Sequence, residues 1–252
     1  MRKIVLITGA TSGIGKACAI RFAENNFDVI ITGRRKDRLD KLSEDLKLKY
    51  GINVLSLNFD IRDRSIVERC INDLPEEWKQ IDVLVNNAGL AVGRDSFDEA
   101  LVDDWELMID TNLKGLTYIT KAVLPLMIAA GQGHIINISS TAGKEVYAYG
   151  NMYCATKHAV TALSESMRID LLKHNIKVTA VHPGATETEF SNVRFKGDTE
   201  KANKVYDGMK PLIGEDVAAV VLYCATLPQH VCINDLVVTC TQQANSFYSH
   251  RN

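Results

Sequence analysis

Short apolar segments alternate with longer segments of helical periodicity along nearly the whole chain, and this alternation limits the folds open to it. The apolar segments are rich in Val, Ile and Leu and are expected to be strands, at residues 4–8, 28–32, 53–58, 82–86, 134–139, 177–182 and 235–239. The segments between them repeat apolar residues at the 3.6-residue period of helices, at residues 14–25, 36–49, 65–74, 102–129, 153–173 and 215–225. Strands that are apolar on both faces are typical of a parallel sheet covered by helices on both sides. We therefore predict a doubly wound, Rossmann-like α/β fold of about seven strands.

The composition favours a single compact domain. The 252 residues, 46% of them hydrophobic, can bury one substantial core, although two small domains would also fit this length. No repeat or linker interrupts the chain, so we predict one domain over residues 1–252.

Several other classes of protein are disfavoured. A net charge of −2 offers no basic surface for nucleic acid. No run approaches the roughly 18 apolar residues of a membrane helix, and the apolar stretch at the N-terminus is broken too early, at Gly9 and Thr11, for an export signal. The six cysteines lack the close pairing of metal ligands. They favour reduced thiols in a cytoplasmic protein without a metal site over a disulfide framework.

A glycine-rich turn, TGATSGIG at residues 8–15, follows the first expected strand and opens the first expected helix. There, Gly9 permits a tight turn, Gly13 lets the backbone approach a pyrophosphate, and Gly15 allows close packing of helix on strand. Such a turn can be purely structural, but its position favours nucleotide binding. The predicted contacts from this turn are Gly9, Thr11, Ser12, Gly13, Ile14 and Gly15.

The end of the second expected strand indicates which nucleotide is bound. A site for a ribose without a 2′-phosphate usually has Asp or Glu there, whereas this chain has Arg34 and Arg35. Arginine matches the geometry of phosphate, so NADP(H) is favoured over NAD(H). The alternative is that both arginines only begin a basic, solvated helix.

Tyr153, Lys157 and Ser140 form a candidate proton-transfer group. Residues four apart lie on one face of a helix, so Lys157 can lie beside Tyr153. A cation close to a phenol lowers its pKa from about 10 toward the range in which an acid or base is efficient. A hydroxyl from Ser140 could hold a substrate oxygen. This arrangement predicts proton exchange with an alcohol or carbonyl.

With these residues in view, the chain resembles the short-chain dehydrogenase/reductase family over essentially its whole length. The turn matches the family pattern TGxxxGxG, residues 86–89 match NNAG, and residues 153–157 match YxxxK. The resemblance implies hydride transfer with a nicotinamide cofactor. It also implies that Tyr153 is the acid or base, that Ser140 orients the substrate oxygen, and that Lys157 binds the nicotinamide ribose.

The resemblance implies further roles by position. Asn112 would hold a water that relays protons from Lys157, and Asp60 would contact the adenine. The remaining implied cofactor contacts are Asn87, Ala88, Gly89, Pro183, Gly184 and Thr188. Taken singly, these residues also have structural explanations: Asn87 could end a strand, and Asn112 could cap or kink a helix.

Within the family, four segments are similar to the NADP-dependent 3-hydroxy acid dehydrogenases, also called serine or allo-threonine dehydrogenases. These are residues 74–78, 109–112, 135–138 and 188–197. Such enzymes act on 3-hydroxy acids and the matching semialdehydes and are usually homotetramers, so a homotetramer is expected here. A carboxylate substrate needs a cation, which Arg194 or Lys196 could supply; we expect Arg194 to join Ser140 and Tyr153 at the substrate.

Residues 184–211 form the only long stretch without a clear period. They follow the strand expected at residues 177–182, and ligands in such folds lie beyond the carboxyl ends of strands. The stretch is therefore a candidate substrate lid, with a simple solvated loop as the alternative.

Other functions remain open from the sequence. The chain could be a broad-specificity carbonyl reductase of the same family, or could take a bulky carrier-bound ketone or a sugar. It could also bind NADP(H) without turnover as a sensor, although such proteins often lack the tyrosine or lysine that this chain keeps at 153 and 157.

Overall fold

A seven-stranded parallel sheet forms the centre of the molecule, as the sequence predicts. The computed structural model describes residues 2–252. The strands lie in the order β3-β2-β1-β4-β5-β6-β9, and each begins and ends within one residue of its predicted position. Their bounds are β1 Ile4–Ile7, β2 Asp28–Gly33, β3 Val54–Asn58, β4 Ile81–Asn86, β5 Gly133–Ile138, β6 Ile176–Pro183 and β9 Asp235–Val238.

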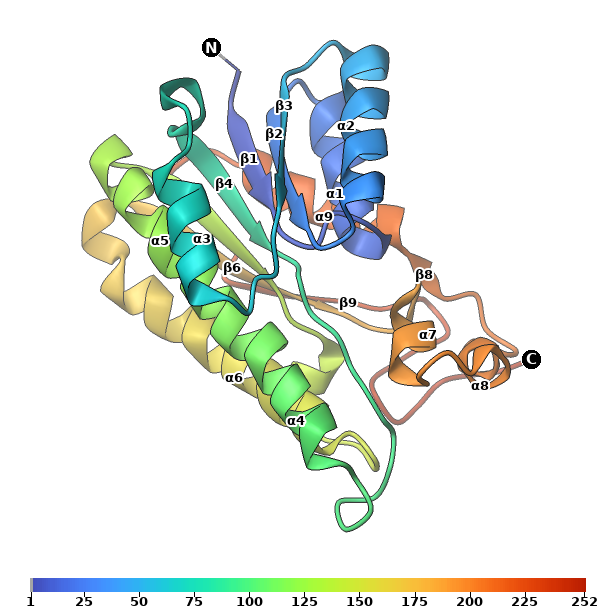
Figure 1. Ribbon diagram of the computed structural model, residues 1–252. Helices are drawn as coiled ribbons and strands as arrows, with labels where there is room; N and C mark the ends of the chain where they lie inside the picture. The colour runs from blue at the N-terminus through green and yellow to red at the C-terminus, as the bar shows by residue number, and fades with distance from the viewer. Residues whose placement is uncertain (1) are drawn as a thin grey trace.

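Helices cover both faces of this sheet (Figure 1). One face carries α1 (Gly13–Glu24), α2 (Lys36–Tyr50) and α9 (Gly214–Thr226). The other carries α3 (Arg64–Asn72), α4 (Val102–Ile109), α5 (Leu116–Ala130) and α6 (Asn151–Asp170). Short 3₁₀ turns lie at η1 (Glu76–Trp78), η3 (Thr141–Gly143) and η4 (Leu172–His174).

The alternation of side chains along β1 shows how the sheet joins two cores. Val5 and Ile7 are buried with residues of α1, α2 and α9, whereas Ile4 and Leu6 are buried with residues of α3 and α5. Successive residues of a strand point to opposite faces, so a strand buried on both sides needs a continuous apolar run. This confirms the doubly wound α/β fold.

The helix expected over residues 102–129 is interrupted by a π-helical turn. The turn, η2 (Asp110–Gly115), joins α4 to α5 in one continuous helical segment. That segment, Val102–Ala130, is long and apolar enough by composition to cross a bilayer. Its residues Ile119, Val123 and Met127 are fully buried against the sheet and α3, so α5 is a core helix.

The stretch at residues 184–211 contains more structure than its lack of a period predicts. It includes β7 (Thr186–Glu187), α7 (Phe190–Arg194) and α8 (Thr199–Lys204), and β7 pairs with β8 (Leu212–Ile213). Helices of five and six residues are too short to show a 3.6-residue repeat, which explains why the sequence analysis did not find them. We refer to residues 184–211 as the lid segment.

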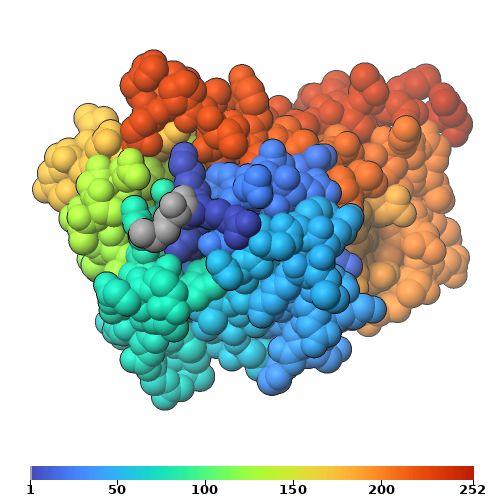
Figure 2. All heavy atoms as spheres, turned by 90° about the horizontal axis from the view of Figure 1, so that it is seen from above, coloured from blue at the N-terminus to red at the C-terminus, as the bar shows by residue number. Residues whose placement is uncertain are grey.

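The lid segment and the C-terminal tail, which is residues 239–252 after β9, project together to one side of the molecule. Figure 2, which views the face where the strands begin, shows these orange and red segments beyond the main body. The tail is held to the lid segment by backbone hydrogen bonding, since the amide of Asn252 donates to the carbonyl of Gly208 at 2.9 Å. All six cysteines are free thiols, and four of them are buried.

Candidate active site

A cavity of about 1060 Å³ opens at the carboxyl ends of the strands, between the glycine-rich turn, α6, the lid segment and the tail. It is large enough for a dinucleotide together with a small substrate. The residues predicted from the sequence that line it are Gly9, Thr11, Ser12, Gly13, Ile14, Arg34, Arg35, Asp60, Asn87, Ala88, Gly89, Ser140, Tyr153, Lys157, Pro183, Gly184, Thr188 and Arg194. Gly15 and Asn112 do not line the cavity, and both support it from behind.

The glycine-rich turn forms a tight cradle on one side of the cavity. Gly9 has a φ of +68°, and a Cβ there would lie 2.9 Å from the Cα of Ala88. At Gly15 a Cβ would lie 2.4 Å from both the carbonyl oxygen of Gly9 and the side-chain nitrogen of Asn87. The Asn87 amide in turn donates to the carbonyl of Thr8 at 2.9 Å. Asn87 therefore braces the turn as well as lining the cavity.

An anion site built from arginines lies beside this cradle. Arg35 donates to Thr11 Oγ1 at 2.8 Å and to Ser12 Oγ at 2.8 Å, which fixes its guanidinium. Its remaining nitrogen contacts Glu189 Oε2 at 2.8 Å, and Arg38 contacts Glu189 Oε1 at 2.6 Å. A carboxylate thus already occupies a fork of two guanidiniums at the end of β2. These donors fit the doubly charged 2′-phosphate of NADP(H). The geometry of the site therefore agrees with the predicted cofactor.

Arg34 and Asp60 face each other at the edge of this anion site. Arg34 Nη1 lies 4.0 Å from Asp60 Oδ2, while Arg62 binds the same carboxylate at 2.6 Å. Hydrogen bonding from Arg62 holds the pKa of Asp60 below its ordinary value. Asp60 lines the cavity, and its contact with the adenine stays a prediction.

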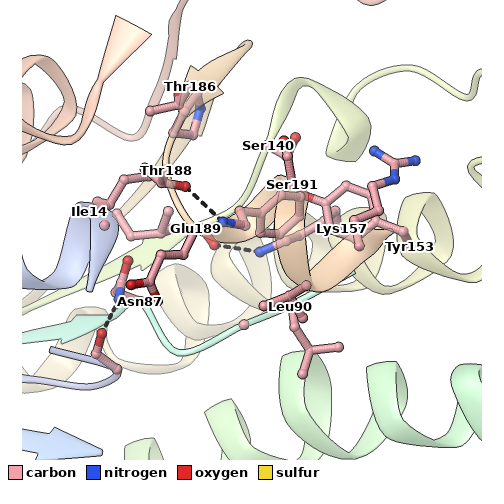
Figure 3. A pocket seen from close by; sticks show the side chains of 18 of the residues that line it. Ile14, Asn87, Leu90, Ser140, Tyr153, Lys157, Thr186, Thr188, Glu189 and Ser191 are labelled. Atoms are coloured by element: carbon pink, nitrogen blue, oxygen red, sulfur yellow. Dashed lines mark hydrogen bonds between the residues drawn. The ribbon is translucent and has the colours of Figure 1, made fainter. Parts of the chain in front are cut away.

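Tyr153 and Lys157 lie on one face of α6 and enter the cavity from the same side (Figure 3). The ammonium of Lys157 donates to the carbonyl of Ile138 at 3.0 Å and lies 5.9 Å from the centroid of the Tyr153 ring. Burial lowers the pKa of Lys157 to about 8. Burial also raises the pKa of Tyr153 far above its usual value, against smaller lowering effects from Ser140 and Arg194.

The expected lowering of the Tyr153 pKa by Lys157 is therefore not what the structure shows. The lysine is directed to a backbone carbonyl, and the loss of water around a buried phenol disfavours the phenolate. The geometry nevertheless brings phenol, ammonium and serine hydroxyl to one point in the cavity, which is the predicted proton-transfer group.

Ser140, rather than Ser139, presents its hydroxyl to the cavity. Ser139 Oγ donates to the carbonyl of Lys157 at 3.1 Å and so faces α6. Ser140 Oγ accepts from the amide of Ala142 at 3.1 Å and stays partly accessible. This difference supports the choice of Ser140 from its spacing to Tyr153.

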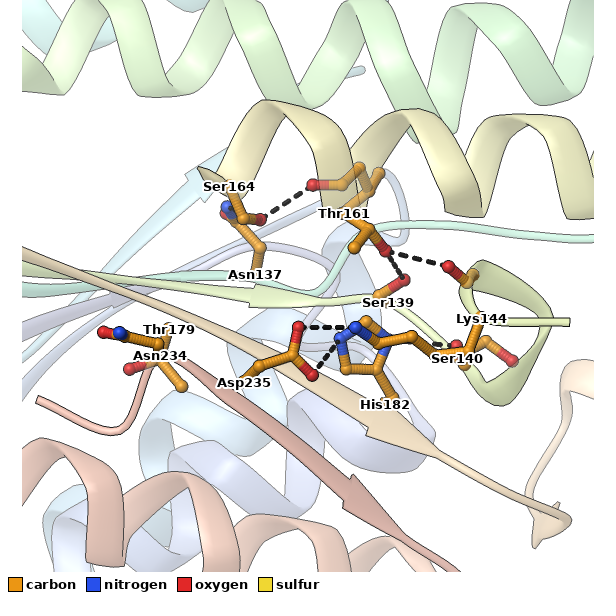
Figure 4. A network of polar contacts seen from close by, with 12 residues as sticks. Asn137, Ser139, Ser140, Lys144, Thr161, Ser164, Thr179, His182, Asn234 and Asp235 are labelled. Carbon is orange, nitrogen blue, oxygen red and sulfur yellow. Dashed lines mark hydrogen bonds and ion pairs between the residues drawn. The ribbon is translucent and has the colours of Figure 1, made fainter. Parts of the chain in front are cut away.

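A polar network at the carboxyl end of β6 holds the backbone of Ser140 in place (Figure 4). His182 Nδ1 lies 3.1 Å from the carbonyl oxygen of Ser140, and its Nε2 lies 3.1 Å from Asp235 Oδ1. The other oxygen of Asp235 accepts from Lys144 at 2.7 Å. The chain of contacts from Lys144 to Ser140 connects the carboxyl end of β6 and the start of β9 to the site.

Asn112 lies in the π-helical turn η2 and is fully engaged by its neighbours. Its amide nitrogen donates to the carbonyl of Leu90 at 2.8 Å, and its amide oxygen accepts from the Leu90 backbone at 2.8 Å. The nitrogen also reaches Thr156 Oγ1 at 3.1 Å. π-helical turns occur often at functional sites, and this one places Asn112 behind Gly89 and Lys157. The water relay through Asn112 stays a prediction.

The substrate end of the cavity is cationic and aromatic. The guanidinium of Arg194 lies 5.6 Å from the ring centroids of both Tyr147 and Tyr153, and its Nε is buried without a hydrogen-bond partner among residues 2–252. Arg94 also lines the cavity, and desolvation together with the charge of Arg194 lowers its pKa. Lys196, the other predicted cation, pairs with Asp104 at 2.8 Å and does not line the cavity.

Sequence reasoning missed several residues of the site. Glu189, Arg94, Phe190 and the tail residues Gln243, Phe247 and Arg251 all line the cavity. Phe190 follows Thr188 closely enough to be suspected, and its ring centroid is 5.6 Å from that of Tyr153. The tail gives no sequence signal. Its Gln243 accepts from the amide of Ala185 at 2.8 Å and so reaches the lid segment from far along the chain.

Comparison with known proteins agrees with this site. Residues 3–199 match the sequence family described as short chain dehydrogenase. The chain is 50% identical over 251 residues to the NADP-dependent 3-hydroxy acid dehydrogenase YdfG of Salmonella typhi, covering 99% of this chain and 100% of the relative. It is 44% identical over 250 residues to sulfoacetaldehyde reductase 2 of Chromohalobacter salexigens, covering 99% of this chain and 98% of the relative.

A solved structure also has the same fold as this chain. The closed form of serine dehydrogenase complexed with NADP+ superposes with a TM-score of 0.92 at 48% identity, covering 99% of this chain and 100% of that one.

Proposed function

Since this chain belongs to the short-chain dehydrogenase family, we propose that it is an NADP(H)-dependent oxidoreductase that interconverts a hydroxyl and a carbonyl on small 3-hydroxy acids. The convergence of Ser140, Tyr153 and Lys157 in one cavity supports the reaction class. The relatives named as 3-hydroxy acid and serine dehydrogenases support the substrate class and cofactor.

A nicotinamide cofactor held by the glycine-rich turn, the arginine fork and Lys157 would supply or accept the hydride of the proposed reaction. Ser140 and Tyr153 hold the substrate oxygen, and Tyr153 gives it a proton in reduction or removes one in oxidation. Lys157 holds the nicotinamide ribose and passes a proton toward Asn112. The lid segment closes over the substrate and excludes water.

The glycine-rich turn and the arginine fork are the proposed cofactor contacts. Gly9 permits the tight turn, Gly13 would let the backbone approach the pyrophosphate, and Gly15 and the NNAG residues support that turn. The proposed contacts of the nicotinamide half are Pro183, Gly184 and Thr188.

Arg194 is the proposed partner of the substrate acid group. It combines a buried donor that has no partner among residues 2–252 with a position beside Tyr153. A carboxylate bound there would satisfy this donor through a charge-assisted hydrogen bond.

A substrate panel tests the proposed function directly. We expect NADP reduction with serine, allo-threonine or 3-hydroxypropionate, measured at the reduced-nicotinamide absorbance band, to exceed that with a plain secondary alcohol or a sugar alcohol. NADPH oxidation with sulfoacetaldehyde belongs in the same panel, because a relative is named for that reaction. Activity only on alcohols that lack an acid group would favour a broad-specificity carbonyl reductase. Failure with every substrate, despite NADP(H) binding, would favour a sensor.

Replacing Arg194 by glutamine is expected to raise KM for the hydroxy acids by a factor on the order of 10 to 100, the range of one hydrogen bond between charged groups. KM for an alcohol without a carboxylate should change little. Lys196→Gln is the matched control, because Lys196 belongs to the same segment but pairs with Asp104 outside the cavity. An equal rise for both substrate types in Arg194→Gln would exclude a carboxylate contact.

Replacing Arg34 and Arg35 together by alanine is expected to raise KM for NADPH by a factor on the order of 10 to 100 while leaving KM for NADH nearly unchanged. The expectation follows from the fixed orientation of the Arg35 guanidinium on Thr11 and Ser12. Arg64→Ala is the control, since Arg64 pairs with Glu68 on the surface of α3. Equal effects on both cofactors would place the phosphate elsewhere.

The protein is further proposed to be cytoplasmic and to form a homotetramer. Large apolar side chains are exposed near the end of α6 and on β9, with Ile169 and Leu172 each 77% exposed and Val237 53% exposed. Such side chains are suited to contacts between subunits. Light scattering of the purified protein measures the number of chains.

A further inference from the structure

Glu189 takes part in neither the proton-transfer group nor the substrate end of the cavity, yet it joins the lid segment to α2. Its carboxylate bridges Arg35 and Arg38, at 2.8 and 2.6 Å. Arg35 is the N-cap of α2 and Arg38 lies in its first turn, far from residue 189 in sequence. The bridge therefore fastens the lid segment to the opposite wall of the cavity.

The fork that Glu189 occupies lies at the end of β2, where the sequence predicts the 2′-phosphate of the cofactor. Arg35 already gives its other donors to Thr11 and Ser12, so the nitrogen facing the cavity is the one bound to Glu189. The hydrogen bond from Arg35, and to a smaller extent that from Arg38, lowers the pKa of Glu189, so this carboxylate is charged at neutral pH. A 2′-phosphate and the Glu189 carboxylate would need the same donors.

We propose that Glu189 is an internal competitor for the 2′-phosphate of NADP(H), displaced from Arg35 and Arg38 when the phosphate binds. This rests on the proposed NADP(H) dependence. A phosphate carries more charge and more acceptor oxygens than a carboxylate, so it can replace Glu189 on the fork. NAD(H) has only a neutral hydroxyl there and cannot replace it. The competition lowers the affinity for NADP(H) and leaves the affinity for NAD(H) unchanged, so Glu189 narrows the discrimination between the two cofactors.

Displacement of Glu189 also acts on the substrate end of the cavity. Glu189 directly precedes α7, which begins at Phe190 beside the Tyr153 ring and ends at Arg194. Figure 3 shows Thr188 and Glu189 on the cavity wall beside Ile14 and Asn87, with Tyr153 and Lys157 across the cavity. Release of one end of so short a helix frees the segment that carries Arg194. Glu189 is thus a specificity-determining residue, and it links cofactor binding to the position of the lid segment.

The test measures nucleotide binding without turnover, by calorimetry at low ionic strength. The probes are 2′,5′-ADP, which carries the 2′-phosphate, and 5′-AMP, which differs from it only by lacking that group. Glu189→Gln is expected to bind 2′,5′-ADP about 3 to 30 times more tightly than the unaltered protein, the range that two half-exposed ion pairs support. Binding of 5′-AMP should stay within about twofold. Glu187→Gln is the matched control, because Glu187 lies two residues earlier, is exposed, and has no ion pair among residues 2–252.

Different failures point to different proposals. Unchanged or weaker binding of 2′,5′-ADP by Glu189→Gln would overturn the competition. So would a loss of 5′-AMP binding in that variant, because Glu189 would then be a partner of the ribose hydroxyl. If the unaltered protein binds 2′,5′-ADP no better than 5′-AMP, the NADP(H) proposal itself is wrong. Glu189→Ser repeats the test if the melting temperature shows that the glutamine variant is poorly folded.

Discussion

Tyr153→Phe is expected to lose turnover by a factor on the order of 10² to 10⁴, the usual contribution of a positioned general acid or base. The substitution removes only the hydroxyl, and the ring can keep its contacts with Phe190 and the Arg194 guanidinium. NADPH binding should therefore change by less than about threefold, which its fluorescence on binding measures. The loss should appear in kcat more than in KM, since the hydroxyl acts on the reacting oxygen.

Tyr147→Phe is the matched control for this experiment. Tyr147 is a half-buried tyrosine of the cavity, its ring centroid also lies 5.6 Å from the Arg194 guanidinium, and its pKa is also raised by burial. Its hydroxyl has no role in the proposed proton transfer, so a change of only a few fold is expected. Similar losses in both variants would indicate a general effect on the aromatic pocket and contradict the role assigned to Tyr153.

The fold could be predicted from the sequence because its signals are local and repeated. Each strand is a short run apolar on both faces, as in β1, and each long helix shows its period over three or more turns. The π-helical turn at Asp110–Gly115 was not predicted, because a single inserted residue hardly alters the apolar pattern of the flanking helices. The short helices of the lid segment were missed for lack of length.

The site could be predicted where its residues lie in continuous motifs or, as for Ser140 and Arg194, in segments that resemble those of the family. The motifs that contain Gly9 and Tyr153 can be identified from neighbouring residues alone. The role of Glu189 depends on its contacts with Arg35 and Arg38, which are distant in sequence. Burial was also beyond the sequence. Spacing places Lys157 beside Tyr153, but the direction of each pKa depends on how much water the fold removes.

Because Lys157 is buried, it is expected to have a large effect on the pH dependence of stability. Its pKa is lowered from 10.5 to about 8, so the folded protein loses this proton at a lower pH than the unfolded chain. Below about pH 8 both states hold the proton, and the folded state bears the full cost of a buried ammonium. Between about pH 8 and 10.5 the unfolded chain binds more protons, so the contribution of Lys157 to stability rises with pH.

Lys157→Met is expected to distinguish the contribution of the buried ammonium to stability from its contribution to turnover. The free energy of unfolding of the unaltered protein, relative to that of the variant, should rise by about 2–3 kcal/mol between pH 7 and 10, since one pKa unit corresponds to about 1.4 kcal/mol. Denaturant unfolding at several pH values measures this difference. Lys47→Met, which alters an exposed lysine of α2, is the control variant.

Turnover in Lys157→Met should fall by a factor on the order of 10² or more, since the variant can neither hold the ribose nor pass a proton. A stability difference independent of pH would show that Lys157 keeps an ordinary pKa, and the burial argument would be wrong. A pH-dependent difference with normal turnover would instead remove Lys157 from the reaction. The expected combination, lost turnover with a pH-dependent stability difference, means that the fold keeps a charge that destabilises it at neutral pH because the reaction requires it.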